Sequence, residues 1–217
     1  MNVIALVGFA GSGKDTAASH LVDNYNFIPF SFAESLKDTL ATVFCWDREL
    51  LSGSTHESRK WRETPDEWWG KKLGISDFTP RKALQLIGTD LFRKHFDPDI
   101  WILNIERKIT LLPENSLVIL TDGRFPNELS LIRRFGGKII RIKRGEEPIW
   151  FETALVANGF GNPDDAKWAE RQMNDVFSVH KSEWAWIGQS LDHVIINNAD
   201  INALQKETER YWSNIIK

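Results

Sequence analysis

Two patterns of apolar positions alternate along the first part of the chain. Residues 3–7 form a short continuous apolar run, which is typical of a strand covered on both faces in a parallel sheet. Apolar residues then recur at helical spacing within 12–25. A second strand is predicted at 27–30, and a helix is predicted from Ala33 to Phe44. The first 44 residues therefore predict the order strand, helix, strand, helix.

Later segments repeat this alternation. Thr79 and Pro80 have the form of a helix N-cap with a first-turn proline, and Asp97-Pro98 begins another predicted helix. The apolar runs in SLVILTD, KIIRIKR and DHVIINN predict three further strands, with helices at 128–135 and 201–216. Strands that alternate with helices predict an α/β fold, a doubly wound parallel sheet of about five strands with its site at the carboxyl ends of the strands.

Two segments depart from the alternation. Residues 45–78 lose clear periodicity and are rich in charge and tryptophan, whereas residues 145–189 are mixed and contain the turn-rich break NGFGNPDD. We interpret residues 1–217 as one domain. Its predicted parts are a core at 1–44, 79–144 and 190–217, a helical insertion at 45–78 and a lid-like segment at 145–189.

Composition narrows the class of protein. A chain of 217 residues that is 42% hydrophobic can bury one sizeable core. The net charge is −3 and the sequence has no block of basic residues, so it does not indicate a surface that neutralises the phosphates of a long nucleic acid. Cys45 is the single cysteine, so an internal disulfide is excluded and a reducing cytoplasm fits. The apolar start stops at Gly8, too short to span a membrane, so we expect a cytoplasmic protein without a membrane partner.

The stretch GFAGSGKDT, residues 8–16, lies between the first predicted strand and the first predicted helix. It fits the phosphate-loop pattern G-x-x-x-x-G-K through Gly8, Gly13 and Lys14. Glycines let successive backbone N–H groups turn toward phosphate oxygens, while the helix start and the lysine add positive charge. The alternative is a plain glycine turn with a solvated lysine. The predicted phosphate-binding residues are Gly11, Ser12, Gly13, Lys14, Asp15 and Thr16.

Asp15 occupies the place where such loops usually carry a serine or threonine that touches Mg²⁺. The next residue, Thr16, has the required hydroxyl. We therefore expect Thr16 to help hold Mg²⁺, directly or through a water molecule.

Four motifs in this order carry a family resemblance. SGKDT, LQLIGTDLFRKHFDPDIW, TDGRFPNEL and HKSEW resemble the deoxynucleoside monophosphate kinases of tailed bacteriophages, which are relatives of the P-loop nucleoside monophosphate kinases. The resemblance covers most of the chain, is weakest at 45–78 and 145–175, and is most specific in GKDT and GTD. It implies a P-loop kinase fold with an acceptor-binding insertion. It also implies transfer of the γ-phosphate of ATP, with Mg²⁺, to a deoxynucleoside monophosphate, for phage DNA synthesis in the host cytoplasm. A homodimer is the family-level expectation.

Asp122 ends a predicted strand and Arg124 follows two residues later. An acid at this place can order a magnesium-bound water or orient the acceptor phosphate, and an arginine can hold that phosphate bidentately. Asp122 could instead cap the helix that starts near Pro126. By resemblance, Glu128 contacts the substrate or fixes Arg124. The predicted catalytic residues are Lys14, Arg81, Asp122 and Arg124, and the predicted metal ligands are Thr16 and Asp122.

Further candidates lie on helices and at strand ends. Arg81, Gln85 and Thr89 recur at helical spacing and could meet an acceptor nucleotide, although such residues are more often solvated. The resemblance favours the functional interpretation for Arg81 and Gln85, and it adds Lys37 as a substrate-binding residue and Arg144 as a contact of ATP. The predicted substrate-binding residues are Lys37, Arg81, Gln85, Thr89, Asp122, Arg124 and Glu128.

The tryptophan-rich insertion allows two interpretations. Arg59, Lys60 and Arg62 lie among three of the ten tryptophans. The arginines could bind the monophosphate with an aromatic face for the base, or tryptophan packing could hold together a lobe with few aliphatic residues.

Two loop motifs also stay open. HKSEW presents His180, Ser182 and Glu183, but it lacks the strand-turn-helix context of a nucleophile triad. The resemblance places its histidine and glutamate after the lid and implies a lid hinge or a donor-nucleotide contact for them. In NNAD, Asn197 or Asn198 could line an adenine pocket, with Asn197 as the predicted ATP contact, whereas Asp200 could be a helix N-cap.

Two rival functions are also compatible with a phosphate-binding loop at residues 8–16. One is a P-loop kinase of another small molecule, such as a coenzyme precursor or a sugar acid. The other is a GTP-dependent switch, because NNAD is similar to the guanine-reading N-K-x-D. Asn198 replaces its lysine, however, and DGRF lacks the glycine that senses the γ-phosphate.

Overall fold

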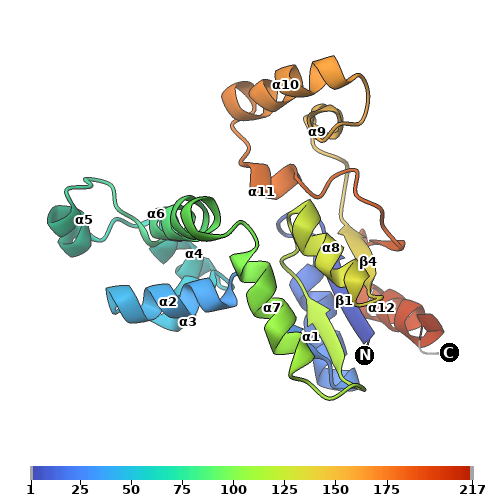
Figure 1. The fold of residues 1–217 in the computed structure, drawn as a ribbon. Coiled ribbons are helices and arrows are strands. Elements are labelled where there is room, and N and C mark those ends of the chain that lie inside the picture. The colour runs from blue at the N-terminus through green and yellow to red at the C-terminus, as the bar shows by residue number, and fades with distance from the viewer. Residues whose placement is uncertain (1, 216–217) are drawn as a thin grey trace. The chain divides into compact units, whose positions relative to one another are not determined.

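Five parallel strands form the sheet of the computed structural model, which describes residues 2–215 (Figure 1). Their order across the sheet is β2-β3-β1-β4-β5, and every pairing is parallel, so the predicted doubly wound sheet of about five strands is confirmed. The strands are β1 (Asn2–Val7), β2 (Ile28–Phe30), β3 (Leu117–Leu120), β4 (Lys138–Lys143) and β5 (His193–Ile196).

Strand β1 lies at the centre of the sheet because its side chains are apolar on both faces. Ile4 and Leu6 belong to the core cluster that contains residues of α1 (Lys14–Tyr25) and α12 (Ile201–Ile215). Val7 points to the opposite face. On that face Gly123 lies beside both Val7 and Leu129 of α8 (Pro126–Arg134). Helices therefore cover both faces, as a doubly wound sheet requires.

The terminal helix closes the core beside α1. Trp212 of α12 is buried and packs edge-on against Phe27, with ring centroids 4.6 Å apart. The helix was predicted to extend to Ile216, which lies outside the described residues. Asp200 accepts a hydrogen bond from the N–H of Ala203 at 2.8 Å, so its interpretation as a helix N-cap is confirmed.

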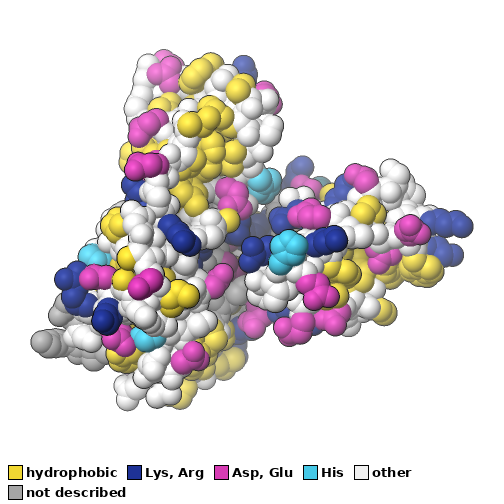
Figure 2. Space-filling model, turned by 180° about the vertical axis from the view of Figure 1, so that it is seen from behind, with side chains coloured by type: hydrophobic (Ala, Val, Ile, Leu, Met, Phe, Trp, Pro, Cys, Tyr) yellow, Lys and Arg dark blue, Asp and Glu magenta, His cyan; other side chains and the backbone are white. Residues whose placement is uncertain are grey.

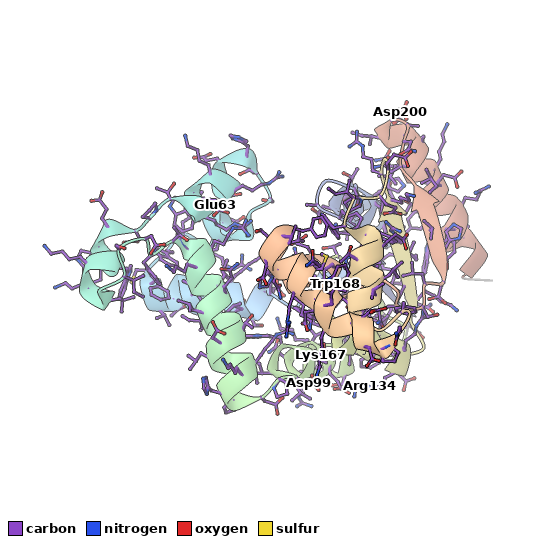
Figure 3. All side chains as sticks on the ribbon, turned by 90° about the horizontal axis from the view of Figure 1, so that it is seen from above. Glu63, Asp99, Arg134, Lys167, Trp168 and Asp200 are labelled. Carbon is purple, nitrogen blue, oxygen red and sulfur yellow. The ribbon has the colours of Figure 1, made fainter. Side chains whose placement is uncertain are left out.

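Two compact units divide the chain. One unit contains the described parts of Met1–Ser31 and Ile109–Lys217, and the other is Phe32–Lys108. The lid-like segment belongs to the first unit and forms α9 (Phe151–Ala157), α10 (Pro163–Arg171), the π-helical turn η2 (Gln172–Val176) and α11 (Lys181–Trp184). Trp168 on α10 is exposed (Figure 3). On the faces drawn in Figure 2, acidic and basic side chains are interspersed over each unit.

The second unit is helical. It contains α2 (Glu34–Phe44), α3 (Arg48–Ser52), α4 (His56–Glu63), α5 (Glu67–Leu73), α6 (Pro80–Gln85), the π-helical stretch η1 (Leu86–Phe96) and most of α7 (Ile100–Thr110). The insertion predicted at 45–78 forms α3 to α5 within this unit. Thr79 caps α6 as predicted, since its hydroxyl accepts from the N–H of Lys82 at 3.1 Å. Between residues 2 and 215, no helix combines the length and the apolar character that crossing a membrane would need.

Tryptophans build the core of the second unit. Trp46 stacks on Phe44 with centroids 4.4 Å apart, and Trp69 meets Phe44 edge-on at 5.0 Å. The indole N–H of Trp46 donates to Asp66 at 2.8 Å, and that of Trp69 donates to the carbonyl of Phe44 at 3.0 Å. These rings are therefore structural, which agrees with the packing interpretation of the insertion.

Candidate phosphate-binding site

The glycine loop leaves β1 at the carboxyl edge of the sheet and enters α1 at Lys14. Gly8, Gly11 and Gly13 have φ angles of 140°, 75° and 101°, a region that side chains strongly disfavour. A Cβ atom on Gly13 would lie 2.5 Å from Nδ2 of Asn197. The sequence thus forms this loop because glycines supply both the backbone angles and the missing side-chain volume.

Lys14 folds back over its own loop. Its Nζ donates to the carbonyl oxygens of Gly8 and Phe9, each at 2.8 Å. Burial lowers the pKa of Lys14 below its ordinary value; Arg124 also lowers this pKa, whereas Asp15 and Glu183 raise it. A half-buried ammonium whose hydrogen bonds within residues 2–215 go to two carbonyl oxygens is suited to exchange these contacts for an anion.

A residue that follows β5 also holds the glycine loop in place. Asn197 is buried and follows this strand, and its Nδ2 donates to the carbonyl of Ser12 at 2.8 Å. The Ser12 hydroxyl is buried as well, and nothing within the described chain forms a hydrogen bond with it. A buried hydroxyl inside a glycine loop fits a phosphate oxygen as partner. Thr16, in the first turn of α1, is half-buried.

Asp122 and Arg124 follow β3 at the same edge of the sheet. The Ser31 hydroxyl, which comes just after β2, donates to Asp122 at 2.6 Å. Glu128 is buried and accepts from the backbone N–H groups of Arg124 and Phe125, at 2.8 and 3.1 Å. Of the two roles that the resemblance implies for Glu128, the fixing of Arg124 therefore has direct contacts in the structure.

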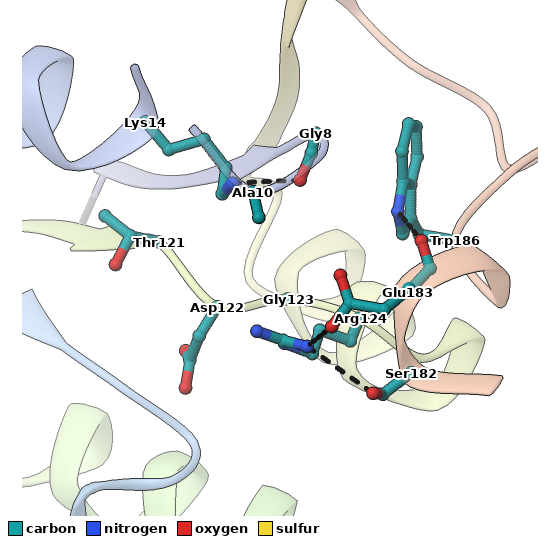
Figure 4. A pocket seen from close by; sticks show the side chains of 10 residues that line it. All are labelled: Gly8, Ala10, Lys14, Thr121, Asp122, Gly123, Arg124, Ser182, Glu183 and Trp186. Carbon is teal, nitrogen blue, oxygen red and sulfur yellow. Dashed lines mark hydrogen bonds and ion pairs between the residues drawn. The ribbon is translucent and has the colours of Figure 1, made fainter. Parts of the chain in front are cut away.

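These elements enclose a pocket in the first unit (Figure 4). Arg124 donates from Nη1 to Glu183 at 2.5 Å and to the Ser182 hydroxyl at 3.4 Å. Lys14 lies on the side of the glycine loop, and Ser182 and Glu183 of α11 lie next to Arg124 (Figure 4). The lining residues are Gly8, Ala10, Lys14, Thr121, Asp122, Gly123, Arg124, Ser182, Glu183 and Trp186.

The HKSEW motif contributes to this pocket without forming a triad. His180 and Ser182 contact each other at 2.9 Å, and His180 caps α11 by accepting from the N–H of Ser182 at 3.3 Å. The Glu183 carboxylate pairs with Arg124. The indole N–H of Trp186 donates to the Glu183 carbonyl at 3.0 Å.

Other predicted residues are not among those that line this pocket. Arg81 forms an ion pair with Glu63 at the end of α4 (Figure 3), and Lys37 donates to the carbonyl of Ser52 at 3.3 Å. Gln85 and Thr89 are exposed at the junction of α6 and η1. All of these residues belong to the second unit. In the first unit, Arg144 is exposed beyond β4 and does not line the pocket.

Sequence reasoning missed Arg141, which is buried in β4. Its guanidinium lies 5.5, 5.3 and 5.0 Å from the ring centroids of Phe9, Phe151 and Trp186, and Nη2 donates to Glu147 at 2.6 Å. We call this group the arginine cage. The only signal in the sequence was an arginine inside the apolar run KIIRIK. Ser31 and Thr121 were also missed, although both directly follow strands at the carboxyl edge.

The chain is similar in sequence to nucleotide kinases of two viruses. No family model matches the chain. A provisionally named deoxynucleotide monophosphate kinase of Acanthamoeba polyphaga mimivirus is 36% identical over 154 residues, which cover 66% of this chain and 75% of that protein. The deoxynucleoside-5'-monophosphate kinase of Escherichia phage T5 is 26% identical over 181 residues, 60% of this chain and 71% of that protein.

Among solved structures, the dephospho-CoA kinase from Campylobacter jejuni covers 99% of this chain and 97% of its own, at 17% identity and a TM-score of 0.46. The mimivirus relative is similar enough, over enough of its length, to show the family. The chain belongs to the deoxynucleoside monophosphate kinases.

Proposed function

We propose that the protein transfers the γ-phosphate of ATP to a deoxynucleoside 5'-monophosphate. The observation that carries this proposal is the pocket in which Lys14 of the glycine loop and Arg124 lie with Asp122 at the carboxyl ends of β1 and β3. Membership of the kinase family supports it. Phosphoryl transfer needs little covalent help from a protein, so positioning and charge stabilisation are what these residues have to supply.

The glycine loop is proposed to hold the donor. Backbone N–H groups of residues 11–16 and the Ser12 hydroxyl would bind phosphate oxygens, and Lys14 would exchange the carbonyls of Gly8 and Phe9 for the anion. Bound ATP, as its magnesium complex, supplies the phosphoryl group and part of the charge neutralisation. Asn197, through Ser12, would keep the loop in place rather than contact the base. Arg144 stays a predicted donor contact.

The acceptor side is proposed from the resemblance and from Arg124. Arg124 would hold the phosphate that receives the phosphoryl group, while Asp122 would orient it or a metal-bound water. Lys37, Arg81, Gln85 and Thr89 of the second unit are proposed as acceptor-binding residues.

Thr16 and Asp122 are the proposed oxygen ligands of Mg²⁺. A hydroxyl and a carboxylate suit this ion, which keeps several waters and takes further oxygens from the substrate phosphates. Thr16→Ser keeps the hydroxyl and should keep magnesium-dependent turnover, whereas Thr16→Ala should weaken it. Equal turnover of both variants, titrated with Mg²⁺, would exclude Thr16 from the metal site.

The decisive experiment measures ADP formation from ATP with purified protein and a panel of acceptors. The panel contains the deoxynucleoside monophosphates, the ribonucleoside monophosphates, coenzyme precursors and sugar acids, with Lys14→Ala as the blank. We expect turnover with at least one deoxynucleoside monophosphate. Turnover confined to a coenzyme precursor or sugar acid would establish the rival kinase, and acceptor-free hydrolysis with a preference for GTP would establish the switch.

A further inference from the structure

We infer that Glu183 positions Arg124 for phosphoryl transfer. This inference rests on the proposed function, because it assigns Glu183 a part in that reaction. Both lid contacts of the guanidinium, with Glu183 at 2.5 Å and with Ser182 at 3.4 Å, use the single nitrogen Nη1. Arginine presents five N–H donors in a planar fork, so the other donors can reach a phosphate while Nη1 keeps its partners.

Arg124 is held at both ends. Its backbone N–H donates to the buried carboxylate of Glu128 at 2.8 Å, and its tip is held by Glu183. The distance between these anchors is spanned by one long, flexible side chain. If only the backbone were held, the guanidinium could rotate. A rotating guanidinium would not keep the orientation that phosphoryl transfer requires.

Glu183 is itself fixed to the buried arginine cage. The indole N–H of Trp186 donates to the Glu183 carbonyl at 3.0 Å, and the Trp186 ring packs against Phe9 with centroids 5.3 Å apart. The Phe9 carbonyl in turn accepts from Lys14. The backbone of Glu183, whose carboxylate holds Arg124, is therefore linked through Trp186 to the loop that carries Lys14.

The exposure of the pair indicates that its role is not stability. The side chains of Arg124 and Glu183 are 47% and 39% exposed, and ion pairs at that exposure contribute about 0–1 kcal/mol. Glu183 also places a negative charge in a pocket meant for phosphate, which opposes nucleotide binding. Loss of this charge should therefore leave nucleotide affinity unchanged or higher while the rate falls, because the arginine loses its orientation.

The test combines Glu183→Gln with Arg124→Ala. We expect Glu183→Gln to lower kcat about tenfold to a hundredfold, the scale of a small misplacement at a reacting centre, without raising the dissociation constant for ATP. In the Arg124→Ala background the same substitution should change kcat less than about twofold. If Glu183 acts only by orienting Arg124, its substitution has no further effect on kcat once the Arg124 side chain is removed. Glu170→Gln is the matched control. It removes a lid carboxylate that pairs with Lys181 at 2.9 Å outside the pocket, and kcat should not change.

Two results would overturn the inference. An equal loss of kcat in both backgrounds would show that Glu183 acts without Arg124. An unchanged or raised kcat for Glu183→Gln would show that the pair does not assist the reaction.

A second readout does not depend on turnover. Nitrogen-15 NMR of the arginine side chains reports rotation about the Nε–Cζ bond, and the Arg124→Ala spectrum identifies the Arg124 signals. We expect slow rotation in the wild type and in Glu170→Gln, and fast rotation in Glu183→Gln. If no acceptor supports turnover, the proposed function fails while this measurement still decides whether Glu183 holds Arg124. Rotation that is equally fast in the wild type would overturn the positioning role.

Discussion

The glycine loop makes a quantitative prediction at Gly13. Gly13 and Gly11 both have positive φ angles, 101° and 75°, but only Gly13 has neighbours where a side chain would go. A Cβ on Gly13 would lie 2.5 Å from Nδ2 of Asn197 and 3.1 Å from Cδ2 of Leu204. A Cβ on Gly11 would meet nothing within 4 Å. Alanine at the two positions therefore separates backbone strain from steric overlap.

The expected magnitudes follow from these two effects. Backbone strain alone should cost Gly11→Ala about 1–2 kcal/mol of the free energy of unfolding. Gly13→Ala should carry a similar strain plus about 1–3 kcal/mol for overpacking, because the Asn197 amide must move from its 2.8 Å hydrogen bond with the Ser12 carbonyl. The difference between the variants should therefore be about 1–3 kcal/mol, or roughly 2–12 °C in the melting temperature of a domain of this size.

Urea unfolding of both variants measures the difference, and a third substitution tests its cause. Asn197→Ala alone should cost about 1–3 kcal/mol because the Ser12 carbonyl loses its buried donor. In that background the extra cost of Gly13→Ala over Gly11→Ala should shrink, since the overlapping atom is gone. Equal destabilisation by Gly11→Ala and Gly13→Ala in the wild-type background would refute the steric argument.

Three further outcomes are expected. Lys14→Ala should lower kcat about 10²- to 10³-fold but change the free energy of unfolding by less than about 1 kcal/mol, because burial already opposes its charge; steady-state kinetics and urea unfolding check this. Arg141→Ala should destabilise by about 1–3 kcal/mol in the same unfolding assay, since it removes the buried guanidinium from the arginine cage and leaves Glu147 paired with Lys143 alone, whereas the exposed Arg144→Ala should cost less than about 0.5 kcal/mol. Burial raises the pKa of Glu147, but hydrogen bonds from Arg141 and Lys143 outweigh it and lower this pKa below the ordinary 4.5. The stability that Glu147 contributes should be complete above 4.5 and lost as the pH falls through the lowered pKa, so the unfolding free energies of wild type and Glu147→Gln in urea should converge as the pH falls through that pKa.

The strand-loop-helix unit could be predicted because its signals are local. The apolar run of β1, the glycines of the loop and the helical spacing in α1 all lie within the first 25 residues, and the structure has each of them. The stretch after α6 could not be predicted in detail, because the chain continues there as the π-helical η1. In η1, Gly88 packs on Leu36 and its carbonyl accepts from the Trp101 indole at 3.0 Å, which are contacts that no local pattern encodes.

The site was predictable where the sheet topology alone decides the position. Asp122 and Arg124 follow a strand, and strand ends of a parallel sheet share one edge, so both line the pocket with Lys14. Arg141 could not be placed in this way. A lone arginine in an apolar strand gives no sign of its neighbours, and the rings that hold it come from three separate segments, at Phe9, Phe151 and Trp186.

Charge balance in the pocket explains why the glycine geometry is so strict. Lys14 and Arg124 contribute two positive charges, Asp122 and Glu183 contribute two negative charges, and the other lining residues are uncharged, so the side chains sum to zero. Side-chain charge within this pocket therefore cannot by itself attract a polyanion. In the proposed reaction the attraction would come from backbone N–H groups, from the amino end of α1 and from a metal ion bound with the nucleotide. Backbone dipoles add up only when they converge on one point, and the positive φ angles of Gly8, Gly11 and Gly13, which other residues avoid, are the kind of backbone that allows such convergence.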